Sequence, residues 1–182
     1  VVALSYWNPI MQFAHAGCPA AMNGVDGARA FVQAARASGL SGIIVPDLSV
    51  EEGAGVRAVA HDAGVAVVCL AAPTSSPERL RLIARASQGF IYYVSVTGTT
   101  GVRCTLPSTM LHGVRQLKLL THKPVCVGFG ISTAEQVHTV ARVADGVIVG
   151  SALIQELSQG PRRTACARAA AFVRRLRAAI PS

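Results

Sequence analysis

The sequence predicts an α/β fold, a (β/α)8 TIM barrel of which about strands 3 to 8 are present in this chain. Apolar strand-like runs alternate with helical segments over the whole length. Near the C-terminus, residues 127–132 (VGFGIS) and 146–151 (GVIVGS) each join a β-branched strand to a glycine and then to a helix start. Such junctions on the last two strands favour a barrel. An open dinucleotide-binding sheet would instead carry G-x-G-x-x-G after its first strand, and the sequence has no such motif there.

Six apolar runs predict six parallel strands. They cover residues 1–6, 42–45, 64–70, 90–95, 124–127 and 147–149. The strands start about 20–40 residues apart, which leaves room for a helix after each strand and so for parallel pairing with right-handed crossovers.

Amphipathic segments between these strands predict the helices. They run from about 27 to 38, from 51 to 61, from 77 onward, from about 107 to 120, from 133 to 142, from 152 onward and from about 164 onward. The third of them begins with Ser76 as its N-cap and Pro77 in its first turn. A long connection with Gly, Pro and Asn links the first strand to the first helix, up to about Asp26.

A complete barrel of this kind needs eight strands and about 250 residues. Six βα units in 182 residues therefore predict a single partial TIM-barrel domain over residues 1–182, lacking the first two βα units. The chain begins with Val1, inside a strand, and from this we expect an upstream part that the sequence does not contain.

Composition excludes several classes of protein. With 51% hydrophobic and 14% charged residues, the chain is not intrinsically disordered. Its mean hydropathy is +0.43, but its apolar runs are about 6–11 residues long, whereas a membrane-spanning helix needs about 20. The five cysteines include no CxxC pair, and only Cys18 has a nearby histidine, His15. We therefore expect no metal site, reduced thiols and a cytoplasmic location.

Net charge is the one compositional feature that could suggest nucleic acid. The formal charge is +8, and much of it comes from arginines near the C-terminus. These arginines alternate with alanines at a helical period, which is typical of a solvated helix face. Aromatic residues make up only 5% of the chain, too few for a base-stacking surface. We expect neither a nucleic-acid nor a membrane partner.

The glycine junctions predict the class of substrate. A glycine between a strand and a helix start leaves backbone N–H groups open at the positive end of the helix dipole, and it lets a bulky anion approach them. Residues 97–105, rich in Gly and Thr, have the composition of a closing lid near such a site. These observations predict a small substrate that carries a phosphate.

Five segments resemble the tryptophan synthase alpha chain family. They are residues 6–10 (YWNPI), 46–52 (PDLSVEE), 89–101, 128–132 (GFGIS) and 146–152, and they occur in the order of that family. The resemblance implies a barrel lyase that cleaves indole-3-glycerol phosphate to indole and glyceraldehyde 3-phosphate in tryptophan biosynthesis. It also implies a heterotetramer, in which indole passes to a beta chain that holds pyridoxal phosphate, so no cofactor is expected in this chain.

The resemblance also assigns roles to residues. Backbone amides at three glycines and one serine would hold the phosphate: Gly101, Gly130, Gly150 and Ser151, the last with its hydroxyl. An inward-pointing tyrosine and three apolar residues would surround the indole: Tyr92, Leu4, Ile44 and Phe129. Thr100 would engage a catalytic aspartate on lid closure, and Asn8 and Asp47 would contact the beta chain. Ordinary structural roles are the alternative: turn glycines, a core tyrosine, core apolar residues, a helix-entry carboxylate and a turn asparagine.

The sequence departs from the family pattern at the catalytic carboxylates. In the family, a glutamate on strand 2 and an aspartate on the following loop move the protons, and both positions would precede Val1. We therefore expect no catalytic residue in this chain, and we expect the chain by itself to be inactive. The connection from Gln12 to Asp26 is also longer than usual, and the pI near 10.0 is more basic than the resemblance implies.

Two alternatives stay open at this point. The chain could be a non-catalytic truncated remnant that at most binds phosphate ligands or a beta chain. It could instead be another phosphate-binding barrel of amino-acid biosynthesis, although residues 6–9 and 46–48 argue against that interpretation.

Overall fold

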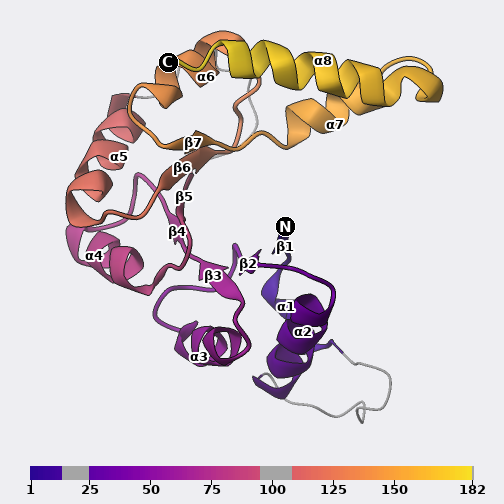
Figure 1. The fold of residues 1–182 in the computed structure, drawn as a ribbon. Helices are drawn as coiled ribbons and strands as arrows, with labels where there is room; N and C mark the ends of the chain where they lie inside the picture. The colour runs from indigo at the N-terminus through magenta and orange to yellow at the C-terminus, as the bar shows by residue number, and fades with distance from the viewer. Residues whose placement is uncertain (14–24, 95–107, 182) are drawn as a thin grey trace. The chain divides into compact units, whose positions relative to one another are not determined.

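A computed structural model describes residues 1–13, 25–94 and 108–181 of the chain (Figure 1). The chain forms two compact units. The first, called here the N-terminal unit, comprises Val1–Leu70 and Leu82–Ile91. The second, the C-terminal unit, comprises Ala71–Arg81 and Tyr92–Ser182.

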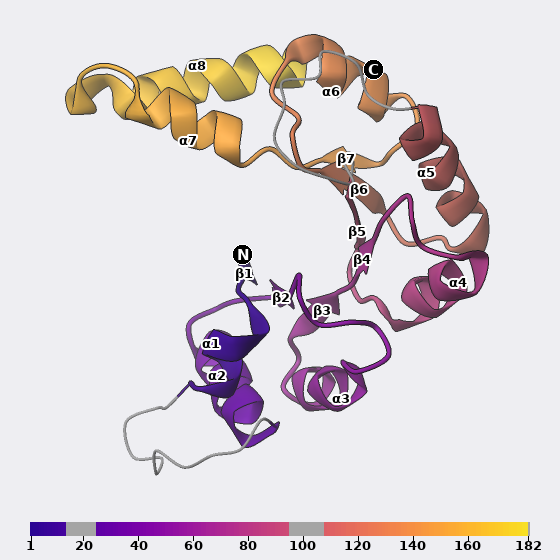
Figure 2. The ribbon, with the colours of Figure 1, turned by 180° about the vertical axis from the view of Figure 1, so that it is seen from behind.

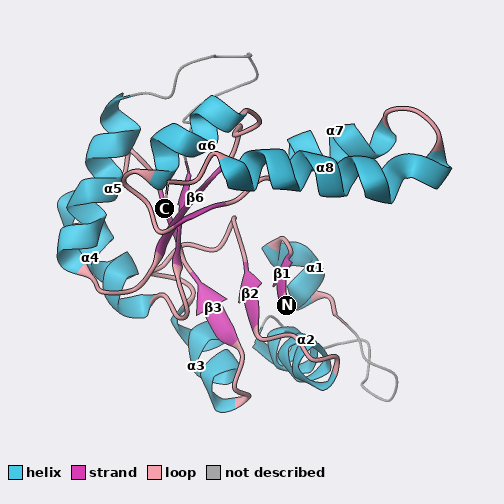
Figure 3. Cartoon of the chain, turned by 45° about the horizontal axis from the view of Figure 1, so that its top comes forward, coloured by secondary structure: helices cyan, strands magenta, loops and turns pink. Residues whose placement is uncertain are grey.

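The N-terminal unit is built on a three-stranded parallel sheet in the order β1-β2-β3 (Figure 3). Its strands are β1 (Val2–Leu4), β2 (Gly42–Ile44) and β3 (Ala66–Val68). Leu4 pairs with Ile44, and Ile44 pairs in turn with Val68. The parallel pairing confirms the prediction made from the alternation of strand and helix.

Three helices belong wholly to this unit: α1 (Trp7–Met11), α2 (Val25–Ala37) and α3 (Ala54–Asp62). Their apolar faces form one core with the sheet, in which Ile10, Val32 and Ile43 are almost fully buried. The end of α1 lies directly against α2, because a Cβ at Gly27 would come within 2.7 Å of the Met11 carbonyl carbon. Helix α1 corrects the prediction that the chain has only a connection between its first strand and about Asp26.

The second sheet has four strands in the order β4-β5-β6-β7, and most of its residues belong to the C-terminal unit. Its strands are β4 (Leu70–Ala71), β5 (Ile91–Val94), β6 (Val125–Gly128) and β7 (Gly146–Val147). The predicted strand over 64–70 is thus divided between the two sheets. The break falls at Cys69, whose N–H donates to the Ser87 hydroxyl at 2.9 Å.

The helices after these strands are α4 (Pro77–Ala86), which runs from one unit into the other, α5 (Ser108–Leu120), α6 (Ala134–Ala141), α7 (Ser151–Ser158) and α8 (Ala165–Ala178). A 3-10 turn, Arg162–Thr164, precedes α8. Met110, Val114 and Leu117 place α5 in the core with no exposed surface. Helices α7 and α8 lie side by side as a hairpin (Figure 2).

The glycine in the middle of α5 has a packing function. A Cβ at Gly113 would come within 2.9 Å of the Tyr93 ring carbon Cζ, so the buried Tyr93 phenol occupies that space. Among the described residues, no helix is long and apolar enough to cross a membrane.

Candidate functional site

The predicted phosphate site begins where β6 ends. Strand β6 finishes at Gly128, and the next two residues, Phe129 and Gly130, both have φ of 73°. This left-handed backbone suits glycine but is uncommon for an aromatic residue. The Phe129 side chain is 51% exposed. The turn therefore presents an aromatic ring at the strand end instead of burying it.

Tyr92 on β5 packs against the same turn. Its side chain is only 5% exposed, and its ring meets that of Phe129 edge to face, with centroids 5.9 Å apart and an interplanar angle of 66°. A Cβ at Gly128 would come within 2.5 Å of the Tyr92 ring carbon Cζ. Burial raises the pKa of the Tyr92 hydroxyl, so the group is protonated at neutral pH and can donate a hydrogen bond.

Helix α6 caps its own N-terminus. Thr133 and Gln136 form a capping box, in which the Thr133 hydroxyl accepts from the Gln136 amide at 3.2 Å. The Gln136 side-chain oxygen accepts from the amides of Ser132, at 2.8 Å, and Thr133, at 3.2 Å. These amides are therefore not open to a ligand. In the described part of the chain, the Gly130 amide has no hydrogen-bond partner.

Helix α7 begins differently. Its N-cap is Gly150, with φ of −116° and ψ of −79°, and among the described residues no side chain caps the helix. The first helical bond runs from the Ile154 amide to the Gly150 carbonyl at 3.1 Å, so the preceding amides point out of the helix start. A Cβ at Gly150 would meet no atom within 4 Å, and Ser151 is exposed. This helix start is therefore accessible to an anion.

The sheet register relates the Gly130 amide to the start of α7 at Gly150 and Ser151; these two sites are called here the glycine openings. Val127 on β6 pairs with Val147 on β7 in parallel, and the Ile148 amide extends the pairing to the Val127 carbonyl at 2.8 Å. Gly130 follows Val127 by three residues, and Gly150 follows Val147 by three residues. The two glycines thus occupy equivalent positions beyond the carboxyl ends of neighbouring strands, where α/β barrels bind ligands.

The predicted apolar residues of the N-terminal unit are direct partners. Leu4 and Ile44 lie opposite each other in the β1–β2 register, with Ile44 buried and Leu4 54% exposed. The structure brings this pair together within its unit, as it brings Tyr92, Phe129 and Gly130 together within theirs.

The two predicted partner-contact residues also have local functions. The Asp47 carboxylate accepts a hydrogen bond at 2.8 Å from the backbone amide of Trp7, the first residue of α1. The Asn8 side-chain oxygen accepts from the Gln12 side chain at 3.0 Å. Both residues are exposed, so these bonds leave them accessible.

Thr100, Gly101 and the lid predicted over 97–105 lie outside the described residues, as do Cys18 and His15. Within the described ranges, no cluster of three or more His, Cys, Asp or Glu side chains could hold a metal ion.

Sequence reasoning did not identify Gly128 as the residue that accommodates Tyr92, nor the self-capping of α6. The capping of α6 could have been predicted, because Thr133-x-x-Gln136 is a capping-box pattern before an apolar run. The function of Gly128 could not have been predicted, because it depends on a contact between β5 and the end of β6.

The sequence model of the family described as "Tryptophan synthase alpha chain" matches residues 1–181. The tryptophan synthase alpha chain of Gloeobacter violaceus is 50% identical over 154 residues, which cover 84% of this chain and 56% of that protein. The one from Rippkaea orientalis is 40% identical over 181 residues, covering 99% of this chain and 63% of the relative.

Solved structures agree with these relatives. A chain of the tryptophan synthase α2β2 complex from Pyrococcus furiosus superposes with a TM-score of 0.81 at 35% identity, covering 97% of this chain and 66% of that one. Tryptophan synthase from Mycobacterium tuberculosis gives 0.81 at 33% identity, covering 98% and 62%. The likeness confirms the α/β barrel-type fold with parallel sheets. The chain spans 56 to 66% of the length of these relatives.

Proposed function

This chain belongs to the tryptophan synthase alpha chain family, and on that premise we propose that its protein cleaves indole-3-glycerol phosphate to indole and glyceraldehyde 3-phosphate. The observation that carries the proposal is the pair of equivalent openings after β6 and β7. Within the described residues, the Gly130 amide has no hydrogen-bond partner and no side chain caps the start of α7 at Gly150 and Ser151, so both supply N–H donors for a phosphate.

The aromatic pair supports an indole beside that phosphate. Phe129 exposes its ring next to the Gly130 amide, and the buried Tyr92 ring packs against it edge to face. An indole ring has the flat apolar face that such a surface accommodates. In this assignment Gly101 would add a phosphate donor, Thr100 would act in lid closure, and Leu4 and Ile44 would be the apolar contacts of the N-terminal unit.

The 182 residues are assigned to substrate binding within one barrel domain that would carry about strands 3 to 8, and not to proton transfer. The sequence of the C-terminal unit has four carboxylates, Glu78, Glu135, Asp145 and Glu156. Asp145 forms an ion pair with Lys118, Glu156 with Arg175, and Glu78 with Arg81. Glu135 lies in the first turn of α6. With no carboxylate assigned to the glycine openings, this chain alone is expected to bind but not to turn over.

A beta chain is the proposed partner, since relatives of this chain occur in α2β2 complexes. Pyridoxal phosphate would then belong to that partner, and this chain would need no cofactor of its own. We place the protein in the cytoplasm, where thiols stay reduced; in the described part of the chain Cys69, Cys126 and Cys166 form no disulfide.

The phosphate site is tested by two substitutions at Ser151. Ser151→Asp places a carboxylate at the uncapped start of α7, where it stabilises the helix dipole but repels phosphate. We expect Ser151→Asp to keep or raise the melting temperature and to weaken glycerol 3-phosphate binding at least tenfold. Ser151→Asn, the uncharged control, should weaken binding far less. If the two variants bound glycerol 3-phosphate equally in calorimetric titrations, the phosphate would not bind at this helix start.

A further inference from the structure

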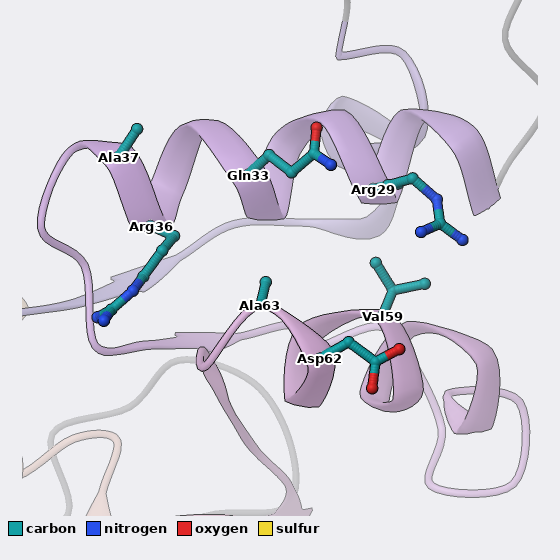
Figure 4. Close-up of a pocket in the computed structure, with 7 residues that line it drawn as sticks. All are labelled: Arg29, Gln33, Arg36, Ala37, Val59, Asp62 and Ala63. Atoms are coloured by element: carbon teal, nitrogen blue, oxygen red, sulfur yellow. The ribbon is translucent and has the colours of Figure 1, made fainter.

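A groove lies between α2 and α3 of the N-terminal unit, and none of its lining residues belongs to the glycine openings (Figure 4). Its volume is about 400 Å³, which is within the range of small-molecule sites. Arg29, Gln33 and Arg36 line it from α2, at positions that share one face of the helix. Val59, Asp62 and Ala63 line it from α3 and the residue after it.

The charges in this groove are not balanced. In the described part of the chain, no carboxylate lies within 4.0 Å of the Arg29 or Arg36 guanidinium. Asp62, the one acidic residue of the lining, is 3.7 Å from His61 instead. The lining therefore carries two guanidinium groups and a single carboxylate.

The apolar surface lies between these charges. Val59 is 8% exposed and forms the floor, with Ala63 beside it. Guanidinium groups bind carboxylate and phosphate through paired N–H donors, and Gln33 adds an amide donor between the two arginines. Figure 4 shows the Arg29 guanidinium at one end of the groove and Arg36 at the other, with Gln33 between them and its amide extending toward Arg29.

We propose that this groove binds a small organic anion, with its carboxylate or phosphate on Arg36 and its apolar body on Val59 and Ala63. Asp62 opposes a second anionic group, so it selects ligands with one anionic end. Removing the Asp62 charge should therefore strengthen binding, and removing the Arg36 charge should weaken it.

A purely structural function for Arg36 makes a different prediction. Its Nε atom lies 3.9 Å from the position of a Cβ at Gly64, so the side chain reaches the C-terminal end of α3, where a cation favours the helix dipole. If this were its only function, Arg36→Gln would lower the melting temperature and leave ligand binding unchanged.

The test uses the full chain labelled with ¹⁵N and titrated with phenyl phosphate and, separately, with benzoate. The two probes distinguish phosphate from carboxylate as the preferred anion. The positions of the shifted amides distinguish the two sites, because a probe at the glycine openings would shift residues 128–130 and 150–154 of the C-terminal unit. Binding in the groove should produce saturable amide shifts in α2, α3 and the residues after α3.

Three variants decide the outcome. Arg36→Gln should weaken probe binding about tenfold, and Asp62→Asn should strengthen it severalfold. Arg115→Gln, which removes an exposed arginine from α5, makes the same change in net charge as Arg36→Gln and should have no effect. Equal losses in Arg36→Gln and Arg115→Gln would show a response to net charge only and overturn the proposal. So would shifts that do not saturate, or weaker binding in Asp62→Asn.

Discussion

The Tyr92 phenol occupies the space that a side chain at Gly128 would fill, with its ring carbon Cζ 2.5 Å from the position of a Cβ there. Gly128 is therefore required by a contact between strands, since its φ is not in the left-handed region. The next residue, Phe129, rests on the same Tyr92 ring. The three residues thus fix the turn that presents Gly130.

We expect Gly128→Ala to destabilise the chain by about 1–3 kcal/mol, because overpacking forces the Tyr92 ring to move. The displaced ring would also shift Phe129 and reduce phosphate binding. Combining Gly128→Ala with Tyr92→Leu should cost less than the sum of the two single changes, because the smaller side chain relieves the clash. Urea unfolding of the four proteins gives this coupling, and strict additivity would mean that Tyr92 is not the obstacle.

Asp145 links three elements of the C-terminal unit and should make stability depend on pH. Its carboxylate accepts from Lys118 on α5 at 2.6 Å and from the Val125 amide at the start of β6 at 2.9 Å. Desolvation acts to raise the pKa of Asp145, but the hydrogen bonds from Lys118 and Val125 and the Lys118 charge lower it overall. A folded-state pKa below the unfolded value means that the stabilisation is present above the unfolded pKa, near 3.9, and is lost as the pH falls through the folded pKa.

Asp145→Asn should therefore remove part of the decline in unfolding free energy between about pH 5 and pH 2. The carboxylate is 37% exposed, so solvent screening limits the effect to roughly 1 kcal/mol or less. Urea unfolding of wild type and Asp145→Asn across that pH range measures the unfolding free energy. Asp62→Asn on α3 is the control, because it makes the same change in net charge. Parallel curves for wild type and Asp145→Asn would contradict the assignment.

How far the sequence predicts the structure depends on whether the deciding contact is local. The β-branched runs suffice to predict parallel strands, and the glycines that follow them suffice to predict turns at Gly130 and Gly150. Each of these features depends only on residues close together in the sequence. Helix α1 escaped prediction because its N-terminal amide is bonded to Asp47, forty residues further along the chain. The break between β3 and β4 has the same origin, since the Cys69 amide is bonded to the Ser87 side chain.

Arg168 should be the residue that holds the α7–α8 hairpin together. Its guanidinium donates to the carbonyls of Glu156, Leu157 and Pro161 at 3.0 to 3.1 Å and also contacts the Thr164 hydroxyl. Lysine cannot reproduce this planar fork. We expect Arg168→Lys to cost about 1–3 kcal/mol and to increase amide exchange in α7. Arg174→Lys, on the exposed side of α8, should leave both unchanged.

Asp47 should affect a partner chain and α1 through different properties of its side chain. Asp47→Asn keeps an oxygen that can accept from the Trp7 amide but removes the charge, whereas Asp47→Ala removes both. If the charge contacts the beta chain, Asp47→Asn should weaken association severalfold with little change in melting temperature. Asp47→Ala should weaken association and also lower stability by about 1 kcal/mol through the lost helix-start bond. Sedimentation with a tryptophan synthase beta chain and thermal melts separate the two effects. If Asp47→Asn bound the beta chain as wild type does, Asp47 would be left with its function at the start of α1 alone.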